Sequence, residues 1–448
     1  MLDPGQVQER CAAAIDLALK VGADAADAVA ICSSSEEVQV RLGKLEDVGR
    51  SESEHLGLRA FVGQRSASIN ATDFSDAALE ELAGRVVAMA KAAPEDRYAG
   101  LAPQDLLAKG PLPELDLEDS SEPSPQQLRA LAEQAEDAAR AVPGITNSEG
   151  GGAGFGRNAV ALVTSHGFSG SYSSTGYSLF AGVVAGEGSG MQRDYEHRSA
   201  RHRADLLSPE QIGRTAGERA VARLDPGRMA SKQMPVVFDP RVGNSLIGHL
   251  IGAMSGPSIA RRASFLLDKL EEELFPPTLR ILEEPHRKRG LHSRPFDGEG
   301  LPTRPRALVE HGKLTGWLTN AASARQLETS LTGHAARGGG GAPGVGTSNL
   351  VLAAGEVSRE ELIADIAEGV LVIELIGHGV NGVTGDYSRG AVGFRIEQGE
   401  IAGPVAEFTV AGNLLDMFGQ MTPASDLEIY RAIDVPTLRV DGMTVAGD

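Results

Sequence analysis

The sequence is poor in cysteine, in aromatic residues and in basic residues. Its 448 residues include two cysteines, Cys11 and Cys32, too few for a disulfide framework, and we expect buried thiols in a reducing cytoplasm. Aromatic residues make up 4% of the chain, and 61 acidic residues against 42 basic ones give a net charge of −19. Negative charge repels phosphate backbones and few aromatic rings remain for base stacking, so the composition argues against nucleic-acid binding.

The chain also has no long apolar run. It contains no stretch of about 18 apolar residues, so we expect no membrane-spanning helix. Its first residues, Met1-Leu2-Asp3-Pro4, lack the basic and apolar regions of a signal peptide. We therefore expect a cytoplasmic protein, and the length suggests two or three domains.

Glycine, in contrast, is abundant, with 55 residues of 448. No three-residue period accompanies it, which excludes a collagen-like chain. The glycines instead indicate many tight turns and stretches of exposed backbone.

Helical and strand periodicities alternate in the first half of the chain. Apolar residues at helical spacing, with capping residues before them, predict helices over about 4–20, 75–92, 125–142 and 208–224. Period-two patterns predict strands over 28–32, 37–41, 56–62, 66–69 and within 159–187. This mixture predicts an α+β layer domain over residues 1–225.

The segment Asp225-Pro226-Gly227 is the clearest domain boundary. Beyond it, helices are expected at about 240–255, 319–327 and 358–368, and short strands after residue 370. Residues 226–448 therefore form a predicted β-rich domain, barrel-like or sandwich-like, and the whole chain belongs to the α+β class.

The glycine-rich segment 338–346 has two interpretations. No Gly-Lys-Ser/Thr and no helix follow it, so it is not a phosphate-binding loop. One interpretation is a flexible connector. The other is a sheet edge that pairs with a peptide, because residues 346–352 have the pattern of a strand. The candidate substrate-binding residues are then Gly344, Val345, Gly346, Thr347, Ser348 and Asn349.

Candidate metal ligands are scattered. His249 lies on the predicted helix 240–255, beside an apolar stripe that includes Leu246 and Leu250, where a satisfied core or interface histidine is expected. Asn244 and Ser245, earlier on the same helix, supply neither a strong ligand nor a base. A catalytic zinc ion takes three protein ligands, so we expect no metal in this chain. His286 and His292 lie in a basic stretch typical of a solvated or interface loop.

Six sequence strings together resemble the TldD/PmbA family over nearly the whole chain. They are 40–46, 57–62, 382–388, 394–400, 411–418 and 436–445. The string Ala411-Gly412-Asn413-Leu414-Leu415-Asp416-Met417-Phe418 resembles the family's PmbA branch, also called TldE.

The resemblance implies a subunit of a TldD–TldE zinc metalloprotease. The TldD branch carries His-Glu-x-x-x-His on a helix and a cysteine near its C-terminus, and the motif positions fall here on Asn244, Ser245 and His249, with no cysteine after Cys32. This implies a non-catalytic chain without cofactor, with zinc in a TldD-type partner, or a homodimer when the chain is expressed alone. The implied substrates are unfolded peptides, including peptide-antibiotic leaders and antitoxin-like proteins. Two alternatives stay open: a stand-alone peptidase with an atypical site, and a regulatory or peptide-binding module.

Overall fold

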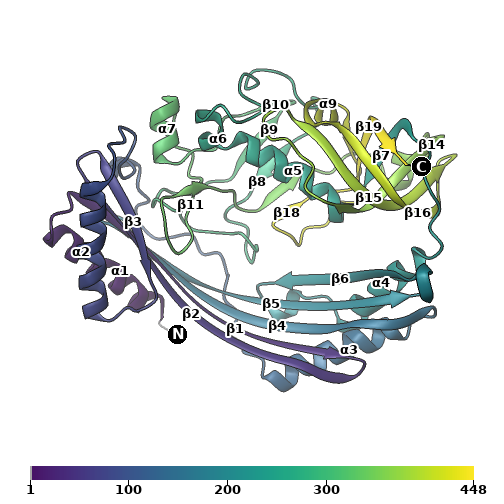
Figure 1. Cartoon of the computed structure of the whole chain (residues 1–448), viewed down its shortest axis with the longest axis horizontal. Coiled ribbons are helices and arrows are strands. Elements are labelled where there is room, and N and C mark those ends of the chain that lie inside the picture. The colour runs from purple at the N-terminus through teal and green to yellow at the C-terminus, as the bar shows by residue number, and fades with distance from the viewer. Residues whose placement is uncertain (1–2, 448) are drawn as a thin grey trace.

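The computed structural model describes residues 3–447, in which a long curved sheet faces a second, barrel-containing domain (Figure 1). The N-terminal domain has strands β1 (Ala25–Arg41), β2 (Lys44–Val62), β3 (Arg65–Ala71), β4 (Ile145–Thr164), β5 (Ser169–Ala185) and β6 (Gln192–Ala200). Its helices are α1 (Pro4–Lys20), α2 (Asp76–Ala92), α3 (Pro125–Arg140) and α4 (Pro209–Ala222). The strands form one antiparallel sheet in the order β3-β2-β1-β4-β5-β6.

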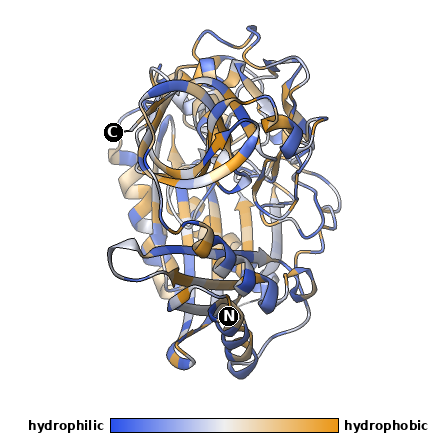
Figure 2. Cartoon of the chain, turned by 90° about the vertical axis from the view of Figure 1, so that its right-hand side faces the viewer, coloured by the Kyte–Doolittle hydropathy of each residue, from blue (hydrophilic) through white to orange (hydrophobic). Residues whose placement is uncertain are grey.

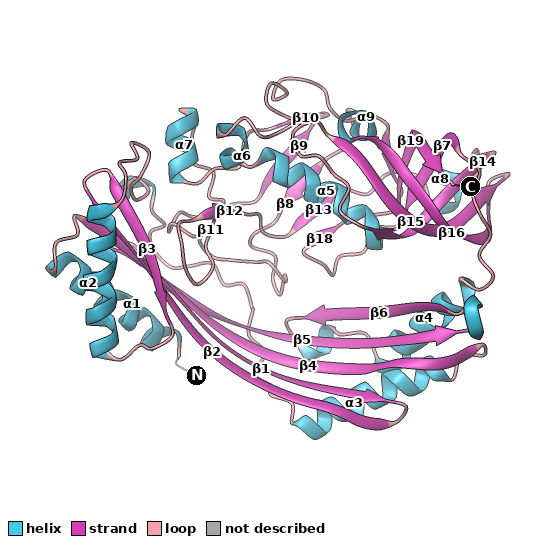
Figure 3. Cartoon of the chain, viewed as in Figure 1, coloured by secondary structure: helices cyan, strands magenta, loops and turns pink. Residues whose placement is uncertain are grey.

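The helices of this domain begin where local capping chemistry predicts. Asp3, Ser124 and Ser208 each accept a hydrogen bond from the backbone N–H three residues on, and a proline follows each cap. The buried faces of α1 and α2 cover β2, β3, the first part of β1 and the last part of β4, and those of α3 and α4 cover β5 and the remaining parts of β1 and β4. All four helices therefore lie on one side of the sheet, and the C-terminal domain lies over the other (Figure 3).

Two predictions about the strands need correction. Residues 28–32 and 37–41 were expected as separate strands, but β1 runs through Ser33-Ser34-Ser35 without a break. It pairs along its length with β2 on one side and β4 on the other, and this non-local pairing overrides the polar interruption. The strands predicted within 159–187 begin earlier, because β4 starts at Ile145. Pairing with β1 and β5 carries β4 through the five glycines between 150 and 156.

The C-terminal domain contains a closed five-stranded barrel, which confirms the predicted β-rich, barrel-like domain. Its strands are β7 (Lys232–Phe238), β14 (Glu368–Ile376), β15 (Asp386–Glu397), β16 (Glu400–Asn413) and β19 (Leu438–Ala446), with β17 (Met421–Pro423) added beside β19. Pairing of β16 with β19 closes the ring, which Figure 2 shows in its upper half. Strands after residue 370 were predicted to be short, and this was wrong for β15, β16 and β19. In β15, β-bulges absorb the interruptions without ending the strand.

Smaller elements complete this domain. A second sheet has the order β10-β9-β8-β13-β18, and β11 and β12 form a separate two-stranded hairpin. The bounds are β8 (Ile281–Glu283), β9 (Arg306–Glu310), β10 (Lys313–Leu314), β11 (Ala335–Ala336), β12 (Gly344–Val345), β13 (Leu350–Leu352) and β18 (Ile433–Asp434). The helices are α5 (Pro240–Met254), α6 (Gly256–Ala260), α7 (Ala321–Leu327), α8 (Arg359–Ile363) and α9 (Leu414–Gly419). The helix predicted over 358–368 is thus shorter, because Glu368 already belongs to β14.

The two domains share apolar and ionic contacts. Phe296 of the C-terminal domain packs edge-on against Phe168 and Tyr172 of the sheet, with ring centroids 4.9 and 5.5 Å apart. Arg289 binds Asp116 at 2.6 Å and Asp205 at 3.3 Å, so the basic stretch near His286 is an interface loop. Within residues 3–447 we find no helix whose length and apolarity would let it traverse a bilayer.

Candidate functional site

Helix α5 carries the three motif positions, Asn244, Ser245 and His249. Asp239 caps the helix by accepting the Arg241 N–H at 2.9 Å, and Pro240 occupies its first turn. Its apolar side, which includes Leu246, Ile247 and Leu250, is buried in the main core of the C-terminal domain. The three motif positions are half-buried on the remaining surface of the helix.

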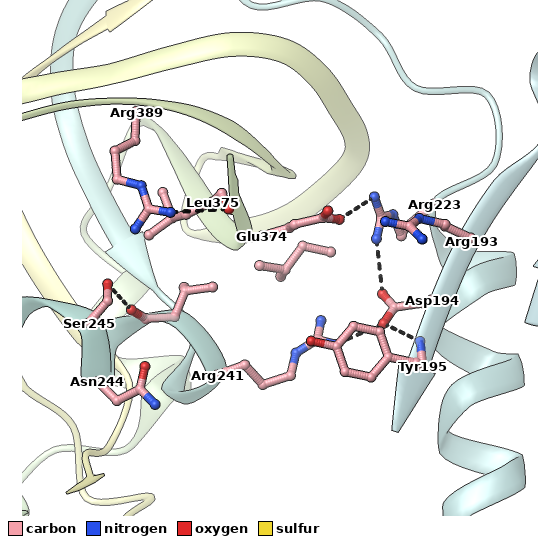
Figure 4. Close-up of a pocket in the computed structure, with 12 residues that line it drawn as sticks. Arg193, Asp194, Tyr195, Arg223, Arg241, Asn244, Ser245, Glu374, Leu375 and Arg389 are labelled. Carbon is pink, nitrogen blue, oxygen red and sulfur yellow. Dashed lines mark hydrogen bonds and ion pairs between the residues drawn. The ribbon is translucent and has the colours of Figure 1, made fainter. Parts of the chain in front are cut away.

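Asn244 and Ser245 line a cavity of about 370 Å³ at the domain junction (Figure 4). The N-terminal domain contributes Arg193, Asp194 and Tyr195 from β6, and Arg223 from the end of α4. The C-terminal domain contributes Arg241, Val242, Asn244 and Ser245 from α5, Ile373 to Leu375 from β14, and Arg389 from β15. The Ser245 hydroxyl donates to the Val242 carbonyl at 2.7 Å, and no hydrogen bond joins the Asn244 side chain to another of the described residues.

Ion pairs join the two sides of this cavity. The buried Asp194 carboxylate binds Arg223 at 3.3 Å and, across the domain junction, Arg241 at 2.8 Å. Arg223 also reaches Glu374 of the barrel at 2.8 Å. Asp194 further accepts the backbone N–H of Tyr195 at 2.8 Å. Because both oxygens of Asp194 are bound, it holds two arginines from different domains in place.

Arg389 differs from the other arginines of the cavity. Among the described residues it has no ion-pair partner, and its Nη2 donates to the Leu375 carbonyl at 3.3 Å. Its Nε is buried without a hydrogen-bond partner, a feature that it shares with Arg223 and Arg241. A part-buried guanidinium stays charged, so the cavity keeps a positive charge that no carboxylate of the described chain neutralises.

His249 lies one turn beyond Ser245 and does not face a carboxylate. Its ring is edge-on to Tyr387, with centroids 6.1 Å apart, and its Nε2 is buried without a hydrogen-bond partner. His249 was expected to be a satisfied histidine, and this was wrong: its ring is half-buried, and its buried Nε2 has no hydrogen bond. Burial, and then the charge of Arg389, lower the pKa of His249, and burial raises the pKa of Tyr387 to about 12.

The side chains around His249 do not suit zinc. Residues 3–447 contain no group of three His, Cys, Asp or Glu side chains placed to hold a metal ion. At the positions before His249 the donors are an amide and a hydroxyl, both weak zinc ligands, and the charge that acts on the His249 ring is that of the cation Arg389. Neither a ligand set nor a general base for metal-assisted hydrolysis is present at this helix.

Comparison with known proteins covers the whole fold. Residues 26–90, 118–224 and 231–447 match domain 1, the central domain and the C-terminal domain of the PmbA/TldA metallopeptidases. The chain is 37% identical to the metalloprotease PmbA of Escherichia coli O157:H7, covering 97% of this chain and 95% of that protein. It is 36% identical to a PmbA homologue of Haemophilus influenzae, over 99% and 96% of the two chains. The chain belongs to the TldD/PmbA family, in its PmbA branch.

Solved structures show the same fold. A candidate DNA gyrase modulator from Bacteroides thetaiotaomicron superposes with a TM-score of 0.90 at 28% identity, covering 98% of this chain and 99% of that chain. TldE from Thermococcus kodakarensis superposes with a TM-score of 0.83 at 21% identity, covering 97% and 99%. The two-domain arrangement seen here is thus that of solved relatives of the TldD/PmbA fold.

The glycine-rich segment of this family member lies against the N-terminal sheet. Arg337, just before it, binds the buried Asp27 of β1 at 2.5 Å. A Cβ on Gly57 of β2 would come within 2.9 Å of the Gly339 carbonyl oxygen, so the two backbones touch. The segment therefore contributes to the contact between the domains as well as connecting β11 and β12.

The candidate substrate-binding residues divide into two groups. Gly344 and Val345 form β12, the Gly346 N–H donates to the His334 carbonyl at 2.9 Å, and Thr347 after them is half-buried. Ser348 and Asn349 are buried, and Ser348 binds Glu283 through its N–H and its hydroxyl at 2.7 and 2.9 Å. The strand that follows, β13, lies between β8 and β18, so the sheet edge expected there is absent: both neighbours pair with it. Peptide binding by residues 344–349 stays a prediction.

Sequence reasoning missed most of the cavity. Asp194, Arg223 and Arg241 come from three separate elements, and nothing in the sequence indicates that they meet. Arg389 directly follows the family string Gly382–Ser388, which was the one available signal.

Proposed function

We propose that this chain is the non-catalytic subunit of a TldD–TldE-type zinc metalloprotease. The observation that carries the proposal is the donor set on α5, where Asn244 and Ser245 stand at the family's ligand and base positions and His249 packs on Tyr387 beside Arg389. In this proposal the zinc belongs to a TldD-type partner, and the heterodimer cleaves unfolded peptides such as antibiotic leaders and antitoxin-like proteins. A lasting interface of this kind buries more than about 1,000 Å².

A reducing cytoplasmic location fits this proposal. Cys11 and Cys32 are both buried and unbonded, and burial raises the pKa of the Cys11 thiol to about 12. Such thiols are unreactive core residues, compatible with a compartment that keeps cysteines reduced.

The test separates the two chains of the complex. The protein is purified alone, with a TldD-type subunit, and as a complex carrying His249→Ala, and each sample is assayed for bound zinc and for turnover of an unfolded peptide. We expect bound zinc and peptide turnover only in the samples that contain the partner. The complex with His249→Ala should turn over the peptide at a rate within about twofold of the unsubstituted complex. The matched control is an alanine substitution of the zinc-binding histidines of the partner, which should abolish turnover.

The opposite result identifies the stand-alone peptidase. Chelator-sensitive cleavage by the isolated chain, lost on His249→Ala, contradicts the proposal. Failure to associate with any TldD-type chain, with peptide binding retained, favours the regulatory module instead.

A further inference from the structure

The interdomain cavity carries more positive than negative charge in a strongly acidic protein. Four arginines line it against two carboxylates, Asp194 and Glu374. Both carboxylates are engaged, with Arg223 and Arg241 as their partners, and Arg193 pairs at 3.4 Å with Glu149, which lies outside the cavity. Arg389 alone among the four has no carboxylate partner in the described chain. In a chain of net charge −19, where acidic residues outnumber basic ones, an arginine without a carboxylate partner is unexpected.

A neutral hydrogen-bonding group lines the same cavity. The Asn244 side chain has no hydrogen bond to the described residues, and its amide can donate as well as accept. Ser245 beside it already donates to the Val242 carbonyl, so its hydroxyl offers only lone pairs. Val242, Ile373 and Leu375 add an apolar wall. A charged donor, an amide donor and an apolar wall suit a ligand with an anionic head and an aliphatic body.

We propose that this cavity binds a peptide carboxylate, with Arg389 as the charged ligand and Asn244 as the neutral one. Arginine presents a planar fork of donors that matches a carboxylate, and the volume of about 370 Å³ admits the end of a peptide or one acidic side chain. The carboxylate comes either from a peptide C-terminus or from an Asp or Glu side chain. The site belongs to this chain alone, so the proposal stands independently of a metalloprotease partner.

Binding to the full-length chain without partner tests the proposal. The probes are fluorescently labelled short alanine peptides of four kinds: with a free C-terminal carboxylate, with a C-terminal amide, and amidated with an internal Glu or an internal Gln. Fluorescence anisotropy gives the dissociation constant of each. We expect at least one carboxylate peptide to bind about tenfold or more tightly than its neutral counterpart, and added salt to weaken that binding. The free-carboxylate and internal-Glu probes distinguish the two sources.

Substitutions then assign the ligands. Arg389→Gln removes the charge and keeps a polar side chain, and should bring the carboxylate peptide to within about twofold of the neutral one. Asn244→Asp places a negative charge in the cavity at nearly constant volume, and should have the same effect by repulsion. The control is Arg395→Gln, on the same strand but outside the cavity and paired with Glu397, which should leave binding unchanged. Thermal unfolding of each variant confirms that it is folded.

Three results would overturn the proposal. Equal affinity for the carboxylate and neutral peptides shows that no carboxylate is recognised. Unchanged binding in both Arg389→Gln and Asn244→Asp shows that the carboxylate binds elsewhere. Inorganic phosphate competing at lower concentration than acetate identifies a phosphate site instead.

Discussion

Glu299 is a buried carboxyl at the junction of the two domains. It accepts the N–H of Ala321 at 2.8 Å, and Arg59 of the N-terminal sheet and the neighbouring Asp297 both act on it electrostatically. Burial raises the pKa of Glu299 to about 7, because desolvation penalises its charged form more than Arg59 stabilises it. The stability of the domain junction should therefore depend on pH near neutrality, through this one carboxyl.

The direction of this pH dependence follows from proton binding. The folded state keeps the proton of Glu299 up to about pH 7, whereas the unfolded state loses it above about pH 4.5, so stability falls as pH rises through this window. We expect the wild type to lose roughly 2 kcal/mol more unfolding free energy than Glu299→Gln between pH 5 and pH 8. Urea unfolding of both proteins across this range measures the difference, and parallel pH profiles would contradict the assignment.

Helix α3 packs unusually close to strand β4. Gly151 of β4 faces the helix, and a Cβ there would overlap the Ala132 carbonyl oxygen. Strand β4 therefore needs glycine at this position. Close backbone approach, in addition to tight turns, explains some of that abundance.

A matched pair of alanine substitutions tests this packing. Gly151→Ala should destabilise the protein by about 1–3 kcal/mol, since the helix must move away from the sheet. Gly176→Ala, in the neighbouring strand β5 with nothing within 4 Å of its added Cβ, should change stability by less than about 1 kcal/mol. Thermal unfolding of the two variants compares them directly. Equal destabilisation would point to a general cost of alanine in this sheet.

Elements fixed by local chemistry could be predicted from the sequence, and elements fixed by partners could not. The capped helices α1, α3 and α4 begin where Asp3, Ser124 and Ser208 indicate. The length of β1 depends on β2 and β4, which lie far apart in the sequence, so its polar centre was misinterpreted as a break. The motif positions on α5 were identifiable from the sequence, whereas the arginines facing them come from separate strands and from the end of a helix.

The two domains are held together by a network of arginine and carboxylate groups along β6. Asp194 binds Arg223 of its own domain and Arg241 of the other. Two residues on, the buried Glu196 binds Arg198 at 3.2 Å and also Arg219. Arg198 lies over the Tyr430 ring of the C-terminal domain, 3.4 Å from its centroid. Removing one member of a buried pair leaves its partner charged and desolvated, which makes this network sensitive to substitution.

Asp194→Asn tests how far the network holds the domains together. Because Asp194 is buried, we expect a loss of about 2–5 kcal/mol and faster hydrogen exchange in β6 and in the first turn of α5. Asp76→Asn, which breaks only an exposed pair with Arg10, should cost less than about 1 kcal/mol. If hydrogen exchange becomes faster only in β6 and stays unchanged in α5, the domains associate without this network.

The closed barrel also constrains the order in which the two domains can fold during synthesis. Its first strand, β7, pairs with its last, β19, so that Lys232 lies opposite Val445, and β19 pairs with β16 as well. The sheet and helices of the N-terminal domain are complete by residue 222, more than two hundred residues before the barrel is. During synthesis, therefore, one half of the molecule can fold while β7 and β16 still present open edges. These edges are the places where a chaperone or an early misfolding contact has the longest time to act.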